Sequence, residues 1–196
     1  MYTEVETGEE NIAKIMSQKS TEGATTTWLV SNCDQTRGAS MRFEFAQRLV
    51  QAGLSFDGYG QCFNNTLLHS PWNTSNGEPG YLSKYLFYLA FENSIHCRDY
   101  LSEKFWRNSL GQGLVPVVYG TLKADVDAVA PSHSYIHVDD FESPKALVDY
   151  LDYLARNQTA YEEYHHWRLA EPTNLSEYQP SHTDGKYTFL KTLLTI

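Results

Sequence analysis

Three side chains that could bind a phosphorylated ligand lie close together in the segment DYLSEK, residues 99–104. Ser102 is a typical helix N-cap, so Lys104 falls in the first turn of a helix, where a cation is unfavourable unless an anion lies nearby. A diphosphate would supply that anion, and Glu103 could accept hydrogen bonds from sugar hydroxyls. Tyr100 could stack on the same ligand or bond to it. The ordinary alternative is a solvated lysine, an acidic residue that favours the helix start and a tyrosine in the core.

A second group of polar side chains is expected at the same edge of the molecule. Arg42 stands at the opening of the preceding helix, and its forked guanidinium suits a diphosphate. Asn32 and Asn93 each follow a predicted buried strand, where an amide could contact a ligand or cap the chain. Arg42 or Lys104 alone is more simply explained as a solvated surface charge. With two such cations at helix starts on one edge of the sheet, a solvated charge and an anion site are about equally good explanations. The residues by themselves predict at most a site for a nucleotide-like anion.

Strand and helix patterns alternate along most of the chain. Apolar, β-branched runs predict strands, and apolar residues at helical spacing predict helices. This alternation predicts an α/β fold, a Rossmann-like parallel sheet flanked by helices. The loops that hold Asn32 and Asn93 then share the carboxyl edge of the sheet, where such folds bind ligands. The predicted strands are residues 26–31, 56–59, 86–91, 114–119 and 134–138, and the predicted helices are residues 41–53, residues 102–112 and a helix that opens at Ser143-Pro144.

Pro116 lacks an N–H and is awkward in a central strand, so it predicts a bulge or a place near the edge of the sheet. Residues 1–24 resemble a linker or lead-in because no core pattern precedes the first strand. The last helix should bury one apolar face, which consists of Leu147, Tyr150, Leu151 and Leu154.

Composition and charge narrow the class of protein. The 196 residues suffice for one well-cored domain, and 41% hydrophobic residues exclude disorder of the whole chain. A net charge of −9 argues against a nucleic acid or an anionic membrane as the main partner. No apolar run reaches the roughly twenty residues of a membrane span. The acidic, polar start of the chain is unlike a signal peptide.

The cysteines and glycosylation sequons leave several alternatives open. Cys33, Cys62 and Cys97 each follow a predicted strand, so all three should lie at one edge of the sheet. One disulfide with a free thiol, a partner beyond the chain's ends, and three unpaired buried thiols are all consistent with this spacing. The sequons are at Asn64, Asn73, Asn157 and Asn174.

The common nucleotide and hydrolase motifs are absent from the sequence. There is no GxGxxG after a strand, no P-loop and no GxSxG elbow. Residues 125–127 have the DxD spacing of metal-dependent sugar transferases, but this short pattern is expected on a solvated connector. His133 and His137 alternate near Asp139 without a fourth ligand, so they are interpreted as structural, and no metal site is predicted.

Several blocks of the sequence resemble the α-1,3/1,4-fucosyltransferase family. They occur in family order over about residues 28–168 and as a set are highly specific. The resemblance implies the GDP-fucose-binding domain, the C-terminal half of a GT-B glycosyltransferase, over residues 25–170, followed by a tail, residues 171–196. The blocks are WLVSNC, the Arg42-Phe43 pair, DGYG, KYLFYLAFENS, DYLSEKFWRNSL, VPVVYG, SYIHVDDFESPKALVDYL and YHHWR. The residues that the resemblance assigns to the donor are Asn32, Arg42, Tyr100, Glu103 and Lys104, and Tyr59 is a weaker candidate near the base. Asn93 is a candidate donor contact because it stands at the end of a strand.

The resemblance also implies a reaction and a location. Fucose would pass from GDP-β-L-fucose to a hydroxyl of an acceptor glycan with inversion, and α-1,3 linkage is the expectation. No cofactor or metal would be required, because two cations could offset the charge of the leaving GDP. The family's acceptor domain, its general base and its membrane anchor are not recognisable in this chain. The family resemblance implies that the chain functions in the Golgi lumen as part of a single-pass type II membrane protein. The alternative is a GDP-sugar-binding module without catalytic activity of its own.

Overall fold

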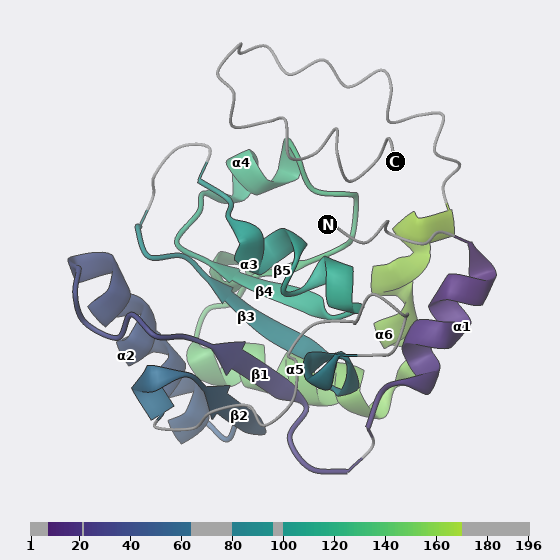
Figure 1. Ribbon diagram of the computed structural model, residues 1–196, viewed down its shortest axis with the longest axis horizontal. Helices are drawn as coiled ribbons and strands as arrows, with labels where there is room; N and C mark the ends of the chain where they lie inside the picture. Colours follow the sequence, from purple (N-terminus) through teal and green to yellow (C-terminus); the bar gives the residue numbers. More distant parts are fainter. Residues whose placement is uncertain (1–7, 21, 64–79, 96–99, 170–196) are drawn as a thin grey trace.

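The computed structural model describes residues 8–20, 22–63, 80–95 and 100–169. The described strands form one sheet in the order β2-β1-β3-β4-β5, and all neighbouring pairs are parallel. This sheet confirms the predicted α/β fold (Figure 1). The strands are β1 Thr26–Leu29, β2 Phe56–Tyr59, β3 Phe87–Phe91, β4 Val115–Tyr119 and β5 Ile136–His137.

The order of the strands creates a switch point between β1 and β3. The chain continues from β1 to β2 on one side of this point and from β3 to β4 on the other. Right-handed crossovers therefore place α2, Arg37–Gln51, and α3, Glu103–Trp106, on opposite faces of the sheet. In Figure 1, α5, Pro144–Arg156, lies on the far face, and it contacts α2. In doubly wound sheets ligands bind at the carboxyl ends of the strands that flank the switch point.

Two predicted helices differ in extent from those in the structure. α2 begins four residues before the predicted start, because the Thr36 hydroxyl accepts the Ala39 N–H at 3.2 Å and caps the helix there. Ser102 caps α3 as predicted, but the helix does not reach residue 112. The Ser109 hydroxyl donates a hydrogen bond to the Lys104 carbonyl at 2.7 Å, and a separate 3₁₀ turn follows α3. Side chains that compete for backbone groups thus set both limits.

Pro116 lies inside β4, which is one strand from the edge of the sheet. The N–H of Val115 bonds to the Leu86 carbonyl on the β3 side, so the nitrogen of Pro116 faces β5. β5 pairs only with Val117 and Val118. Among the described residues, no strand lies opposite Pro116 on that side, so the sheet loses no hydrogen bond through the missing N–H. This confirms the predicted position near the edge.

Residues 9–17, expected within a linker or lead-in, form the helix α1, Glu9–Ser17. Its Ile12 and Ile15 are buried, and the N–H of Gly8 bonds to the Arg168 carbonyl at 2.8 Å. Ile15 packs against Gly113, whose φ of 71° and lack of a Cβ permit the close approach. Residues 8–17 are therefore packed into the domain.

The remaining helices are short except for α5. Ser143 caps α5, and its buried face consists of Leu147, Val148, Leu151 and Leu154, whereas Tyr150 is half-buried. The short helices are α4, Lys123–Asp127, and α6, Gln158–Glu162. Asn157 caps α6, and the other three sequons lie outside the described residues. No helix in the described part of the chain is long and apolar enough to cross a membrane.

Cys33 and Cys62 form a disulfide. The bridge joins the loop after β1 to the 3₁₀ turn Gln61–Phe63 after β2, both at the carboxyl edge of the sheet. Of the alternatives left open by the sequence, three unpaired thiols are excluded, and Cys97 lies outside the described residues.

The double substitution Cys33→Ser with Cys62→Ser should destabilise the fold. The bridge spans 29 residues, so its loss is expected to lower the free energy of unfolding by about 3 kcal/mol. Urea unfolding measures the difference, with the oxidised and reduced wild-type protein as the comparison. A loss below about 1 kcal/mol would show that the bridge constrains the unfolded chain little.

Candidate functional site

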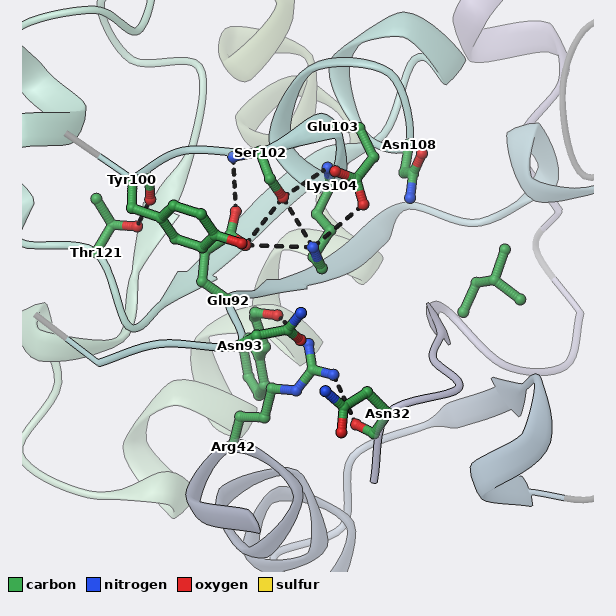
Figure 2. A network of polar contacts seen from close by, with 12 residues as sticks. Asn32, Arg42, Glu92, Asn93, Tyr100, Ser102, Glu103, Lys104, Asn108 and Thr121 are labelled. Carbon is green, nitrogen blue, oxygen red and sulfur yellow. Dashed lines mark hydrogen bonds and ion pairs between the residues drawn. The ribbon is translucent and has the colours of Figure 1, made fainter. Parts of the chain in front are cut away.

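Lys104 stands in the first turn of α3 with its ammonium inside a polar network (Figure 2). The ammonium donates to Ser102 Oγ at 2.8 Å, to Glu103 Oε1 at 3.2 Å and to Glu92 Oε2 at 3.3 Å. Each of its three hydrogens thus has an acceptor, and the side chain is only 12% exposed. The explanation of Lys104 as a freely solvated surface charge is therefore wrong.

Glu92 is the residue of this network that the sequence did not single out. Its carboxylate is fully buried at the end of β3, where it accepts the Ser102 N–H at 2.8 Å and the Ser102 hydroxyl at 2.9 Å. A signal was present, since an acidic residue directly follows a strand that is apolar throughout. A buried carboxylate needs such partners, and Ser102 and Lys104 supply them.

Glu103 is the exposed member of the network, with 49% of its side chain accessible. Partial burial would raise its pKa, but the Lys104 charge together with hydrogen bonds from Lys104, from Ser102 and from the backbone outweighs that effect and holds the pKa of Glu103 below its ordinary value. The side chain is therefore an ionised acceptor at neutral pH. Of the three partners of Lys104, it is the one that can move away into solvent.

Arg42 lies in the second turn of α2 and is buried, with 1% exposure. Its guanidinium donates to the Phe91 carbonyl at 2.7 Å and to the Asn32 carbonyl at 2.8 Å, and it lies 5.2 Å from the centre of the Trp28 ring. Burial lowers its pKa from the ordinary value. The predicted position at the helix opening is corrected, since α2 begins five residues earlier, and the alternative of a solvated surface charge is excluded by burial. Arg42 connects the ends of β1 and β3 beneath the switch point.

Asn32 and Asn93 lie on the two sides of the Arg42 guanidinium (Figure 2). The Asn32 side-chain oxygen accepts the Gln35 N–H at 3.2 Å, which makes it a turn-forming residue. The Asn93 side-chain oxygen is buried without a hydrogen-bond partner in the structure. A Cβ on Gly38 would lie 2.1 Å from the Asn93 carbonyl oxygen, so only glycine lets α2 approach this loop.

Tyr100 is partly exposed and anchored through its backbone. Its carbonyl accepts the Thr121 hydroxyl at 2.6 Å, and the residue is 37% exposed. The Thr121 carbonyl accepts from His137 Nε2 at 2.9 Å, while His137 Nδ1 accepts the Asp139 N–H at 3.2 Å. One neutral tautomer satisfies both bonds, so His137 has the structural role predicted for it.

Tyr59 is separated from the other predicted donor residues. Its hydroxyl lies 2.7 Å from the Tyr85 hydroxyl and donates to the Tyr81 hydroxyl at 3.2 Å. Burial, together with the hydrogen bond to Tyr81, raises the pKa of Tyr59 to about 12. The side chain is buried in the core of the domain, so the structure does not bring it to the Lys104 network.

The site as a whole places two cations on successive residues at the end of β3. Arg42 binds the carbonyl of Phe91, and Lys104 binds the side chain of Glu92 (Figure 2). Their two positive charges are balanced by Glu92 and Glu103. An arriving diphosphate can take the place of Glu103 on Lys104, since Glu103 is exposed and can turn to hydroxyl groups.

The candidate metal residues have other roles. The DxD segment, residues 125–127, lies in α4 instead of a connector, and Asp127 accepts the Tyr135 hydroxyl at 2.6 Å. His133 stacks on Tyr164 with ring centres 4.3 Å apart. Within the described ranges, no three His, Cys, Asp or Glu side chains gather in a way that could hold a metal ion.

Known proteins share this fold. A crystal structure of an α1,3-fucosyltransferase with GDP superposes with a TM-score of 0.57 and 24% identity, over 94% of this chain and 52% of that chain. A second, with GDP-fucose, superposes with a TM-score of 0.54 and 22% identity, over 95% and 52%. At this identity the likeness concerns the fold, and this chain corresponds to about half of each of these structures.

Sequence comparison is more specific. Human 4-galactosyl-N-acetylglucosaminide 3-alpha-L-fucosyltransferase FUT5 is 42% identical over 141 residues, which cover 72% of this chain and 34% of the relative. Glycoprotein 3-alpha-L-fucosyltransferase A of Drosophila melanogaster is 41% identical over 142 residues, which cover 72% and 27%. The chain thus spans between about a quarter and a third of the length of these relatives. The model of the C-terminal region of glycosyltransferase family 10 (fucosyltransferase) matches residues 17–189, and the chain belongs to this family.

Proposed function

We propose that this chain is the donor-binding half of a fucosyltransferase and holds GDP-fucose at the switch point between β1 and β3. The observation that carries the proposal is the placement of Lys104 and Arg42 on either side of the Phe91–Glu92 peptide. Lys104 binds the diphosphate directly, and the buried Arg42 adds a positive potential beneath it. Glu103 accepts hydrogen bonds from donor hydroxyls.

In the proposed reaction an acceptor hydroxyl attacks the anomeric carbon of fucose as the bond to GDP breaks. The leaving diphosphate gains negative charge, which Lys104 and Arg42 stabilise. A general base must take the proton of the attacking hydroxyl. We assign that base and the acceptor site to a second domain of the GT-B fold, outside this chain.

The acceptor is proposed to be a glycan, and the linkage to be α-1,3. The names of the relatives FUT5 and fucosyltransferase A support this choice, since both specify transfer to a 3-position. The Golgi lumen is the proposed location, and the Cys33–Cys62 disulfide fits an oxidising compartment of the secretory pathway.

Calorimetric titration with GDP, UDP and ADP tests the donor assignment. We expect GDP to bind most tightly, by about tenfold or more over UDP and ADP, because the diphosphate is common to all three and the base differs. Titration with GMP measures how much the second phosphate contributes to the affinity for GDP. Equal affinities for the three diphosphates would contradict the assignment to GDP-fucose.

A transfer assay separates the enzyme half from an independent binding module. The chain alone is expected to bind GDP-fucose without transferring fucose to an N-acetyllactosamine acceptor. Addition of a GT-B acceptor domain from a relative, as one fused chain, is expected to yield transfer. A fused protein that binds both substrates and still transfers nothing would favour the module.

A further inference from the structure

Glu92 has the most complete set of buried bonds in the Lys104 network. We propose that Glu92 is a positioning residue, which holds the Lys104 ammonium so that one of its hydrogens faces the diphosphate of the donor. The proposal rests on the proposed function for the identity of the ligand. The placement of Lys104 by Glu92 is a statement about the free protein and can be tested without any ligand.

Hydrogen-bond directions define the role of Glu92. The Ser102 hydroxyl oxygen accepts a hydrogen bond from the Lys104 ammonium at 2.8 Å and one from the Lys104 backbone N–H at 3.4 Å. The hydroxyl has a single proton to donate. Its own proton therefore goes to Glu92 Oε2, while Glu92 Oε1 accepts the Ser102 N–H. Both oxygens of Glu92 act as acceptors, so the geometry requires a carboxylate at this position.

The backbone of Glu92 is held as firmly as its side chain. The Glu92 N–H donates to the Tyr119 carbonyl at 3.0 Å, which continues the ladder between β3 and β4. The carbonyl of the same peptide group, that of Phe91, accepts from Arg42. The carboxylate thus projects from a peptide that is clamped at both ends, and such rigid support is what a precise binding site requires.

The three acceptors of Lys104 differ in how easily they can be replaced. Glu92 is fully buried, and Ser102 is bonded to it through both its N–H and its hydroxyl. Glu103 lies at a similar distance from the ammonium, 3.2 Å against 3.3 Å for Glu92, but its side chain is half exposed. An incoming phosphate can therefore replace Glu103, whereas Glu92 and Ser102 keep the ammonium in place and fix the direction of its third hydrogen.

A purely structural role for Glu92 is the competing explanation. In that case Glu92 would serve only to cap the start of α3 through Ser102, and Lys104 would be placed by its own helix. Glu92→Gln separates the two roles. The amide oxygen can still accept the Ser102 N–H, but the amide nitrogen cannot accept from Lys104 or from the Ser102 hydroxyl.

The first measurement is made on the free protein. Brief acylation with acetic anhydride, followed by mass spectrometry, compares modification of Lys104 with that of Lys145, whose side chain is 64% exposed. We expect Glu92→Gln to raise the ratio of Lys104 to Lys145 modification by about threefold or more, because the ammonium loses a charge-assisted bond. Glu142→Gln removes the same charge at an exposed position and should leave the ratio unchanged.

The second measurement is the affinity for GDP and for guanosine. Glu92→Gln is expected to weaken GDP binding about tenfold, since one charged hydrogen bond no longer orients Lys104, and to leave guanosine binding unchanged. Ser102→Ala serves the same test if Glu92→Gln fails to fold, with the same direction expected in both measurements.

The outcomes separate this proposal from the proposed function. An unchanged acylation ratio in a folded variant, or equal losses for GDP and guanosine, would overturn the role of Glu92. If the wild-type protein binds no GDP, the proposed function fails, and the acylation ratio still decides whether Glu92 places Lys104.

Discussion

Lys104→Ala is expected to weaken GDP binding about 100-fold while the fold remains intact. Charged hydrogen bonds contribute about 1.5–3 kcal/mol each, and the variant removes the ammonium that faces the diphosphate and leaves Glu92 and Glu103 to repel it. In an enzyme that contains the acceptor domain, turnover should fall at least as far, because the charge on GDP grows in the transition state. Calorimetry and a fucosyl transfer assay measure the two effects.

The control for this substitution is Lys145→Ala, which removes an exposed lysine paired with Asp149 on α5. It should leave GDP binding unchanged. Circular dichroism of the Lys104 variant should match the wild type, since Ser102 and Glu92 still bond to each other. GDP affinity within a few-fold of the wild type would remove Lys104 from the donor site.

Arg42→Met should destabilise the domain by about 3 kcal/mol or more. The Phe91 carbonyl would lose a charged donor in a buried place and the Asn32 carbonyl in a partly buried one, and each unsatisfied carbonyl costs about 1–3 kcal/mol. Met is similar in length and apolar, so packing against Trp28 is largely kept. Urea unfolding measures the loss in free energy.

Arg48→Met is the matched control, because Arg48 lies on the same helix with an exposed side chain. It is expected to change the free energy of unfolding by less than about 0.5 kcal/mol. A loss below about 1 kcal/mol for Arg42→Met would mean that water or other donors satisfy the two carbonyls. Arg42 would then be free to serve the ligand directly, as the resemblance implied.

The sequence by itself determined the parts of the molecule that depend on neighbouring residues. The apolar runs predicted the strands of a parallel sheet, Ser102 and Ser143 predicted the starts of α3 and α5, and the family blocks predicted a fucosyltransferase C-terminal region. Such signals are local, because periodicity and capping involve residues within a few positions of one another.

Only the tertiary structure decided which distant residues meet. The sequence does not predict that α1 belongs to the domain, because its partner, the segment around Arg168, lies at the other end of the described chain. Arg42 reads as a surface cation in the sequence, yet the order of β1 and β3 buries it between two strand ends. Glu92 carries no local sign of its partners, since Lys104 reaches it only after the chain has left β3 and turned into α3. The pairing of strands brings these groups together, and this pairing is not written in any short stretch of the sequence.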